Sequence, residues 1–381
     1  MEQPTCRACR GQSGHLVLDL GDQPACDYFP RSDDPGPDPV YPLQMWLCSS
    51  CGLAQLVADR TLAEEPRGAE PAALVEQAAD AVDRAAQAGL LTAGTRVAEY
   101  GSPHGGSWLG LLAARGLIPV ASGEQADVVL DCFGMMHAPD QQAAVASRAA
   151  RVAPGGLLLL QYHALATISR CGQWNALRHG HYAYYSTTAL TQMLAGQGFC
   201  PRTAWSFDLY GGTVLLAARR VAEPDAGPGE SVTRLLMEDE LSGVRDPGVL
   251  SALESQARAQ AQALRDYLTA ERAAGRTVIG YGAASRAVAL LRWAKVDSSL
   301  LSAVVDASPA KQGLRLPGSD IPIVSPAQLT VRKPDAVLLF LADLRAEVRA
   351  AYPEVEASGA RWVDAESLGA VPSNAVRPAG P

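Results

Sequence analysis

Four cysteines near the N-terminus form the pattern with the clearest chemistry. Cys6-Arg-Ala-Cys9 and Cys48-Ser-Ser-Cys51 are two CxxC pairs, with 38 residues between them. Four thiolates held in two such turns meet the tetrahedral coordination of zinc, and a site closed by four protein ligands is typical of a structural ion. The alternatives are a redox dithiol or two chance pairs, but two pairs in one block favour zinc. We therefore predict a structural zinc ion at these four cysteines.

A second pattern, in the C-terminal third of the chain, is suited to an anion. Gly280 and Gly282 follow a strand-like run, and glycine there lets the backbone approach a ligand. The next helix would present its N-terminus to a phosphate, with Arg286 in its first turn. Asp306 ends the following strand, a position suited to ribose hydroxyls, and Lys311 adds a second cation. These residues predict a site for a diphosphate-linked ligand, whereas a lone Gly-x-Gly would indicate only a tight turn.

A third glycine-rich turn stands in the middle of the chain. The strand-like run 97-VAEY-100 is followed by Gly101, Ser102 and Gly105, and then by an apolar helical pattern. A strand, a tight turn and a helix start cradle a nucleotide cofactor in doubly wound folds. After that helix only nine residues precede the next strand at Ala126, too few for the usual second strand, acidic turn and helix. The sequence therefore leaves open whether the turn still holds a cofactor.

Alternating strand-like and helical runs must position these residues. Such alternation predicts an α/β protein, with mostly parallel sheets covered by helices on both faces. A long amphipathic helix is expected from about Asp246 to Ala274. The predicted divisions are a zinc-binding domain at 1–60, a connecting helix at 61–94, a Rossmann-like domain at 95–220, a linker and helix at 221–275, a second Rossmann-like αβ domain at 276–370 and a disordered tail at 371–381.

Composition excludes some classes of function. The net charge of −8 over 381 residues argues against a nucleic-acid or anionic-membrane surface. No apolar run approaches the length of a membrane span, and no signal-peptide core is visible, so we expect a cytoplasmic protein. Without an export signal, the eight cysteines indicate metal binding or free thiols rather than disulfides. The oligomeric state cannot be inferred from the sequence.

Longer stretches carry a resemblance to a known family. They are CRAC at 6–9, LDLGDQP at 18–24, YPLQMWLCSSCGLAQL at 41–56, FGMMHAPD at 133–140, RHGHYAYYS at 178–186, GYGAASRAVALL at 280–291 and VDASPAKQGLRLPGSDIPIVSP at 305–326. Taken together they resemble the zinc-dependent deoxysugar C-methyltransferases, which act on keto sugars attached to a nucleoside diphosphate. The resemblance runs from Cys6 to about Asp364. It implies a central domain of the S-adenosylmethionine (SAM) methyltransferase type, a C-terminal domain that holds the sugar nucleotide, and a setting in deoxysugar or antibiotic biosynthesis.

The resemblance also implies where SAM would bind. Relatives have a Gly-Ser-Asn-Asp-Gly-like turn, and here His104 replaces its aspartate. The implied cofactor-binding residues are Glu99, Gly101, Ser102 and Gly105. Glu99 would meet the amino group of the methionine portion. Glu124 is the one acid that could replace the missing ribose-binding residue.

The catalytic residues that the resemblance implies are partly changed. Relatives use a His at the position of His137 and a Tyr-His-Glu-His run where this chain has Arg178, His179, Gly180 and His181. His137 and His181 are therefore candidates for proton transfer beside a ketone, one as base and one as donor to the enolate. His179, Arg178 and Tyr185 complete the candidate set.

Three functions remain open. The first is a C-methyltransferase in which His181 deprotonates a carbon next to the ketone of a nucleotide-linked sugar. The second is a SAM-independent enzyme that performs proton transfer, such as an epimerase or tautomerase. The third is a non-catalytic pathway partner that binds a sugar nucleotide or another enzyme.

Overall fold

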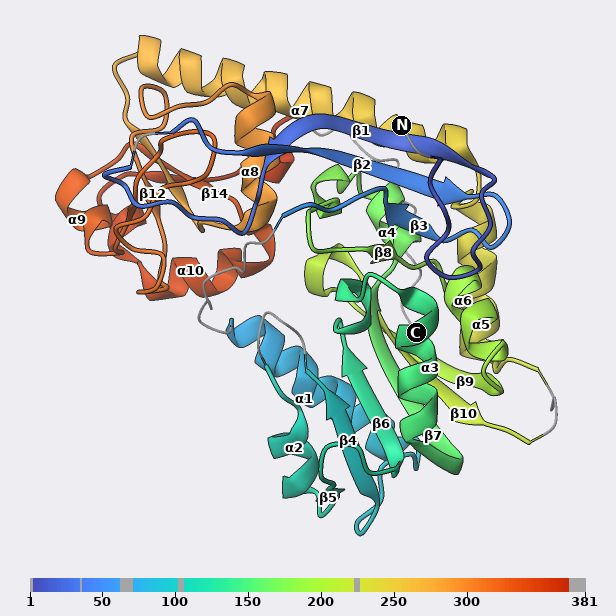
Figure 1. Ribbon diagram of the computed structural model, residues 1–381. Helices are drawn as coiled ribbons and strands as arrows, with labels where there is room; N and C mark the ends of the chain where they lie inside the picture. Colours follow the sequence, from blue (N-terminus) through green and yellow to red (C-terminus); the bar gives the residue numbers. More distant parts are fainter. Residues whose placement is uncertain (1–2, 35, 62–70, 102–105, 223–226, 370–381) are drawn as a thin grey trace.

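The computed structural model describes residues 3–34, 36–61, 71–101, 106–222 and 227–369, whose strands form three sheets (Figure 1). The N-terminal sheet is antiparallel and contains, in spatial order, β1 (Gly14–Pro24), β2 (Val40–Cys48), β3 (Ala54–Leu56) and β8 (Ala183–Tyr184). The last of these strands comes from the middle of the chain, which the sequence did not indicate. The predicted tail at 371–381 lies outside the described residues.

The central sheet has six strands. Their spatial order is β5 (Ile118–Pro119), β4 (Arg96–Tyr100), β6 (Ala126–Cys132), β7 (Val152–His163), β10 (Thr213–Arg220) and β9 (Phe199–Phe207). The first four strands are parallel, and β10 is antiparallel to both of its neighbours. This arrangement confirms the predicted α/β class.

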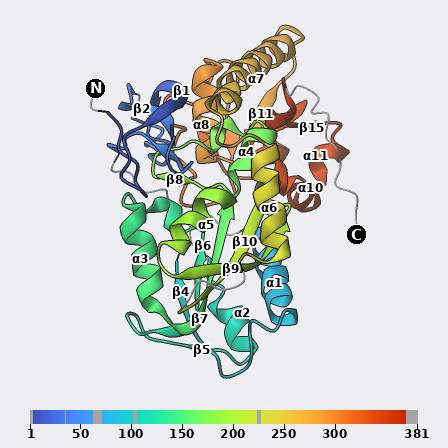
Figure 2. The ribbon, with the colours of Figure 1, turned by 90° about the vertical axis from the view of Figure 1, so that its right-hand side faces the viewer.

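Helices cover both faces of the central sheet, as Figure 2 shows for α3 on one side and α1 and α2 on the other. Leu157 and Leu159 of β7 belong to the core under α1 (Ala72–Gln87) and α2 (Leu109–Ala114). Leu158 and Leu160 point to the opposite face, under α3 (Gln141–Arg151), α5 (Thr187–Ala195) and α6 (Glu230–Leu241). Because side chains alternate along a strand, the apolar run of β7 is buried on both faces.

The expectation that the second strand is missing was too strong. β5 is present but has two residues, which pair with Arg96 and Val97 at the start of β4. The chain then runs into β6 without a helix or a further strand. What the central domain lacks is the acidic turn and the helix that normally separate these strands.

The C-terminal sheet is parallel throughout. Its spatial order is β13 (Ile323–Val324), β12 (Val304–Val305), β11 (Val278–Tyr281), β14 (Ala336–Leu339) and β15 (Arg361–Asp364). Its short helices are α8 (Ser285–Trp293), α9 (Gln328–Arg332), α10 (Arg345–Ala351) and α11 (Glu354–Ala357). After β11 the chain adds β12 and then β13 on one side of this strand, and it then crosses to the other side to form β14. The carboxyl end of β11 is therefore a topological switch point, and ligands bind at such points in α/β sheets.

The predicted long helix is α7 (Pro247–Ala273). The Asp246 side chain caps it by accepting a hydrogen bond of 2.8 Å from the Gly248 N–H, and Pro247 occupies the first helical position. α7 runs along the β1–β2 hairpin (Figure 1), and Leu250, Leu253 and Leu264 join one core with that hairpin and the C-terminal domain. No helix among the residues that the structure describes has the length and apolar character needed to cross a membrane.

A buried ion pair fastens the hairpin to the C-terminal domain. The guanidinium of Arg315 contacts both carboxylate oxygens of Asp38 at 2.7 Å, and both side chains are nearly inaccessible. The Gly318 N–H donates to the same carboxylate at 2.6 Å. Burial alone would raise the pKa of Asp38, but these hydrogen bonds and the charge of Arg315 lower it instead.

We expect Asp38→Asn to lower the free energy of unfolding by about 3 kcal/mol, because among the described residues it leaves the buried guanidinium with only the exposed Asp320 as counter-ion. Urea denaturation measures this loss. Asp33→Asn, which removes an exposed partner of Arg31, is the matched control and should change stability by less than about 1 kcal/mol. Because the folded pKa of Asp38 is lowered, its contribution is present above about pH 4 and disappears as pH falls through the folded pKa. If Asp38→Asn lowered the free energy of unfolding as much in acid as at neutral pH, the ionised carboxylate of Asp38 could not be the origin of the loss.

Candidate active site

A cavity of about 380 Å³ lies where the carboxyl ends of the parallel strands of the central sheet face those of the C-terminal sheet. Tyr100, Cys132 and His163, which end β4, β6 and β7, line it from the central domain. Gly282 and Asp306 line it from the C-terminal domain. One cavity therefore joins the two regions that the sequence analysis singled out separately.

Two histidines lie together in this cavity. The ring centroids of His137 and His181 are 4.6 Å apart, and the rings are nearly perpendicular at 84°. Nδ1 of His137 lies 3.0 Å from the Gly180 carbonyl oxygen. A carbonyl only accepts, so Nδ1 of His137 carries a hydrogen and Nε2 is the ring atom that can exchange a proton with a substrate.

Local hydrogen bonds fix the turn that carries His137. This residue ends the short 3₁₀ helix η1 (Met135–His137), which directly follows β6. The Asp131 carboxylate accepts hydrogen bonds from the backbone N–H groups of Gly134 and Met135, at 2.8 and 3.0 Å. Its other oxygen lies 2.7 Å from Arg148 of α3. A buried carboxylate with this many partners is rigid, so η1 has a defined direction.

His181 is positioned by its neighbours in the loop before β8. Arg178 places Nη2 3.0 Å from Nε2 of His181, and its Nη1 donates to the Ser285 hydroxyl at the start of α8. The resemblance implies a glutamate at the position of Gly180, two residues after this arginine. Here the arginine itself orients the histidine.

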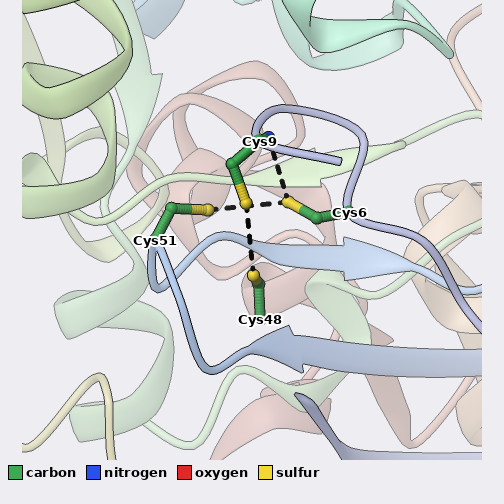
Figure 3. A group of neighbouring side chains, drawn as sticks. All are labelled: Cys6, Cys9, Cys48 and Cys51. Atoms are coloured by element: carbon green, nitrogen blue, oxygen red, sulfur yellow. Dashed lines mark hydrogen bonds between the residues drawn. The ribbon is translucent and has the colours of Figure 1, made fainter. Parts of the chain in front are cut away.

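The four cysteines converge on one point (Figure 3). Their sulfur atoms all lie within 4.8 Å of one another; Sγ of Cys6 is 3.5 Å from that of Cys51, and Sγ of Cys9 is 3.6 Å from that of Cys48. Zinc–sulfur bonds of about 2.3 Å in a tetrahedron require sulfur separations close to these values. The contact with Cys51 lowers the pKa of Cys6 to about 5, whereas the contact with Cys6 together with burial raises the pKa of Cys51. A divalent cation would let all four sulfurs ionise, so the site fits zinc.

The cysteine loop also supports the segment that carries His137. Arg7, between the first two cysteines, donates to the Pro139 carbonyl at 2.8 Å, and Arg10 contacts the Asp140 carboxylate at 2.5 Å. β3, which follows the last cysteine, pairs with β8 two residues after His181. The zinc-binding region is thus a support for both imidazoles.

Two of the predicted catalytic residues, His179 and Tyr185, lie in positions that do not favour contact with a substrate in the cavity. His179 is 2% exposed, and its Nε2 lies 3.4 Å from the Pro42 carbonyl, on the side of β2 and away from the cavity lining. Tyr185 borders the cavity, but its hydroxyl donates to the Gln141 side chain, and burial raises its pKa well above the usual value. We therefore leave both out of the proposed catalytic set.

On the cofactor side, Glu99 borders the cavity but already has partners. Its carboxylate accepts hydrogen bonds from Ser107 Oγ at 2.6 Å and from the Trp108 N–H at 2.7 Å, and so holds the start of α2. Gly101 is exposed, while Ser102 and Gly105 lie outside the described residues. The Glu99 carboxylate can still accept a further bond, and the carboxyl edge of β4 and β6 is open to the cavity, so the methionine end of SAM fits.

The described residues do not place Glu124 where the ribose of SAM would bind. Glu124 pairs with Arg96 at 2.8 Å, and Arg96 is the first residue of β4. Glu124 therefore lies at the amino edge of the sheet, opposite to the cavity. The suggestion that it replaces the ribose-binding acid is wrong, because the chain turns back after the two residues of β5.

In the C-terminal domain, hydrogen bonds between residues of the predicted anion site hold its turn in place. Asp306 accepts a hydrogen bond of 2.7 Å from the Ala283 N–H, which fixes the turn after Gly282. Lys311 is buried and donates to the Ala283 carbonyl at 2.9 Å. Gly282 has a φ of +89° that favours glycine. The turn is therefore preformed in front of α8.

Two members of the predicted anion site have additional or different roles. A Cβ on Gly280 would lie 2.8 Å from side-chain atoms of both Phe340 and Val304, so this glycine permits packing inside the sheet rather than ligand approach. Arg286 borders the cavity and pairs with Glu366 at 3.2 Å, and it lies over the ring of Tyr210. Its charge is therefore already partly compensated before any ligand binds.

His163 is a cavity residue that the sequence analysis gave no role. It ends β7 and borders the cavity, and its pKa is lowered to about 3 by burial and by the charges of Arg286 and Arg178. A third imidazole, whose charged form is disfavoured by burial and by two nearby arginines, therefore lies in the site. Its position at the carboxyl end of a predicted parallel strand could have identified His163 as a site residue, since ligands bind at that edge of a sheet.

Comparisons with known proteins match successive parts of the chain. The family model of the C-methyltransferase C-terminal domain matches residues 208–365, that of a zinc binding domain matches residues 6–61, and that of a methyltransferase domain matches residues 119–203. The last match begins after the altered glycine turn. The C-methyltransferase NovU of Streptomyces niveus is 25% identical over 402 residues, which cover 94% of either chain.

Solved structures resemble part of the chain. The N-methyltransferase NodS of Bradyrhizobium japonicum, in complex with S-adenosyl-L-homocysteine, is 13% identical with a TM-score of 0.30, over 40% of this chain and 89% of that chain. Magnesium protoporphyrin IX methyltransferase of Synechocystis is 14% identical with a TM-score of 0.30, over 38% and 83%. The family matches, in chain order and together with the relative of nearly equal length, make the chain similar over most of its length to C-methyltransferases that carry a zinc binding domain.

Proposed function

We propose that the protein is a SAM-dependent C-methyltransferase acting on a keto sugar linked to a nucleoside diphosphate. The observation that carries the proposal is the single cavity that joins the His137–His181 pair to the preformed turn before α8. The relative NovU is named as a C-methyltransferase. A deoxysugar substrate and a setting in specialised metabolism remain part of this proposal.

The C-terminal domain supplies the binding end of the site. The first N–H groups of α8 have no partner within the helix and carry the positive end of its dipole, so they favour a diphosphate. Arg286 and Lys311 add positive charge near this point, and Asp306 holds the turn in place. A nucleotide bound there would project its sugar toward the central sheet.

The paired imidazoles supply the proton chemistry. His181 Nε2 takes the proton from the carbon next to the ketone, and the electrons of that C–H bond form the enolate. His137, protonated, donates from Nε2 to the developing enolate oxygen, while the Gly180 carbonyl stabilises its Nδ1–H. When bound beside Glu99, SAM supplies the methyl group that the enolate carbon takes up, and S-adenosylhomocysteine leaves. The abstracted proton stays on His181 until it passes to solvent.

The affinity for the cofactor tests this proposal. Because no acid of the described part of the chain stands at the usual ribose position, we expect two hydrogen bonds to be lost, which costs roughly 2–4 kcal/mol. We expect S-adenosylhomocysteine to bind saturably, but about thirtyfold to a thousandfold more weakly than to a methyltransferase that retains this acid. Titration calorimetry measures the affinity, and silence up to millimolar ligand would remove methyl transfer.

The shortened β5 favours a second candidate function. A chain that had lost the cofactor would still hold the nucleotide turn and both imidazoles, and would perform proton transfer alone, as an epimerase or tautomerase. Deuterium entering a keto-sugar nucleotide from D₂O without SAM, and without later methylation when SAM is added, would favour this candidate.

A further inference from the structure

Asp59 is a carboxylate that contacts the histidine loop from the end of the zinc-binding region. It follows β3, which ends at Leu56, and it does not belong to the lining of the cavity. Its Oδ2 accepts a hydrogen bond of 2.5 Å from the backbone N–H of Gly180, 121 positions later in the chain. The N-terminal region therefore contributes a charged side chain to the loop that carries His181.

The other oxygen of this carboxylate fixes its direction. Oδ1 of Asp59 accepts hydrogen bonds from the backbone N–H and the hydroxyl of Thr61, at 2.8 and 2.7 Å. Because each oxygen is bonded to a different segment, the half-buried carboxylate cannot rotate without breaking a charge-assisted bond. Asp59 is thus a rigid anchor for Gly180.

Gly180 connects this anchor to the first imidazole. Its φ of +80° is a conformation that favours glycine, and with it the N–H reaches Asp59 while the carbonyl oxygen lies 3.0 Å from Nδ1 of His137. The backbone N–H of Tyr182 also donates to the Met136 carbonyl at 2.8 Å. The loop and η1 are therefore joined on both sides of His181, and a shift of Gly180 would move the acceptor of His137.

A purely local role would need only one oxygen of the carboxylate. Asp297 shows such a case, because its Oδ1 accepts from the backbone N–H and the hydroxyl of Ser299, at 2.9 and 2.6 Å, outside the cavity lining. Asp59 makes the same two local contacts and adds the long-range bond to Gly180. The long-range bond is the contact that a local turn does not explain.

We propose that Asp59 is a positioning residue for proton transfer in the cavity. Through Gly180 it holds the carbonyl that keeps the hydrogen of His137 on Nδ1, so that Nε2 is the nitrogen left for the substrate. The catalytic consequence rests on the proposed function, whereas the chain of contacts from Asp59 to His137 does not. The zinc-binding region would in this way determine the chemical state of an active-site histidine.

The first experiment measures exchange of solvent deuterium into dTDP-4-keto-6-deoxyglucose by the full chain. In Asp59→Ala we expect kcat for exchange to fall about tenfold to a hundredfold, as for loss of a hydrogen bond to a charged group, and KM to stay within about twofold. Asp59→Asn keeps one neutral acceptor and should give an intermediate kcat. Asp297→Ala, which removes the matching local contacts, should leave both constants unchanged. Unfolding curves establish that each variant is folded.

The second experiment needs no substrate. ¹⁵N NMR at about pH 8.5, above the range in which histidine ordinarily titrates, reports which ring nitrogen of His137 carries the hydrogen, with the signals assigned from His137→Gln. The wild type and Asp297→Ala should show the hydrogen on Nδ1, and Asp59→Ala should show a mixture of the two tautomers.

Two results would overturn the positioning role and leave the proposed function standing. One is a folded Asp59→Ala that exchanges deuterium with the kcat of the wild type. The other is an unchanged tautomer of His137 in Asp59→Ala, which would mean that Gly180 holds its place without the carboxylate. If the wild type takes up no deuterium but its tautomer depends on Asp59, the proposed function fails while the contact chain to His137 stands.

Discussion

Replacing His181 with alanine is expected to slow proton abstraction from a keto-sugar nucleotide by about a thousandfold, which corresponds to roughly 4 kcal/mol of barrier. The reason is that in the proposed mechanism Nε2 of His181 is the base and His137, 4.6 Å away between ring centroids, stabilises the enolate. The measurement is the rate at which solvent deuterium enters dTDP-4-keto-6-deoxyglucose at saturating concentration.

His15→Ala is the matched control for this substitution. His15 is exposed on β1, and its loss should leave the exchange rate within about twofold, as for surface changes worth less than 0.5 kcal/mol. Unfolding curves establish that His181→Ala remains folded. Exchange that persisted in folded His181→Ala at the wild-type rate would show that another group is the base.

Removal of one zinc ligand is expected to have the largest effect on stability. We expect Cys9→Ser to lower zinc content well below one ion per chain and to destabilise the protein by about 5 kcal/mol or more, since a structural zinc site contributes its binding energy to folding. Cys9 is exposed, so the substitution removes little packing, and the loss reports on the metal. Metal analysis and thermal unfolding measure both effects.

The zinc prediction also extends to the active site. Arg7 and Arg10 connect the cysteine loop to Pro139 and Asp140, just after His137, so loss of the ion should reduce exchange activity as well. Cys171→Ser, at an exposed cysteine outside the quartet, is the control and should change neither zinc content nor stability. Full zinc content and normal stability in Cys9→Ser would contradict the assignment.

Much of the fold could be predicted from patterns among residues that are close together in the sequence. Asp246 followed by proline and an apolar period marks α7 to within a residue, because a cap and a helical period are properties of neighbouring residues. The two CxxC pairs likewise predict the sulfur cluster, since four ligands for one ion must converge wherever the chain runs between them. The parallel strands of the central and C-terminal sheets follow from alternating strand-like and helical runs.

Contacts between distant segments could not be predicted in the same way. Tyr185 is close to His181 in sequence, but its hydroxyl donates to the side chain of Gln141, at the start of α3. The pairing of Arg178 with Ser285 depends on how two domains meet, and β8 joins the N-terminal sheet only through tertiary packing. Glu124 looked suitable by its position in the chain, yet the short β5 puts it at the wrong edge of the sheet.

The central claim is that one cavity presents a diphosphate-linked keto sugar to the paired imidazoles. The most direct test is incubation of the full chain with dTDP-4-keto-6-deoxyglucose in D₂O, with and without SAM, followed by mass spectrometry of the sugar nucleotide. The account predicts deuterium at the carbon next to the ketone in both samples and an added methyl group only with SAM. A sugar nucleotide that binds the protein and takes up neither deuterium nor methyl would contradict it.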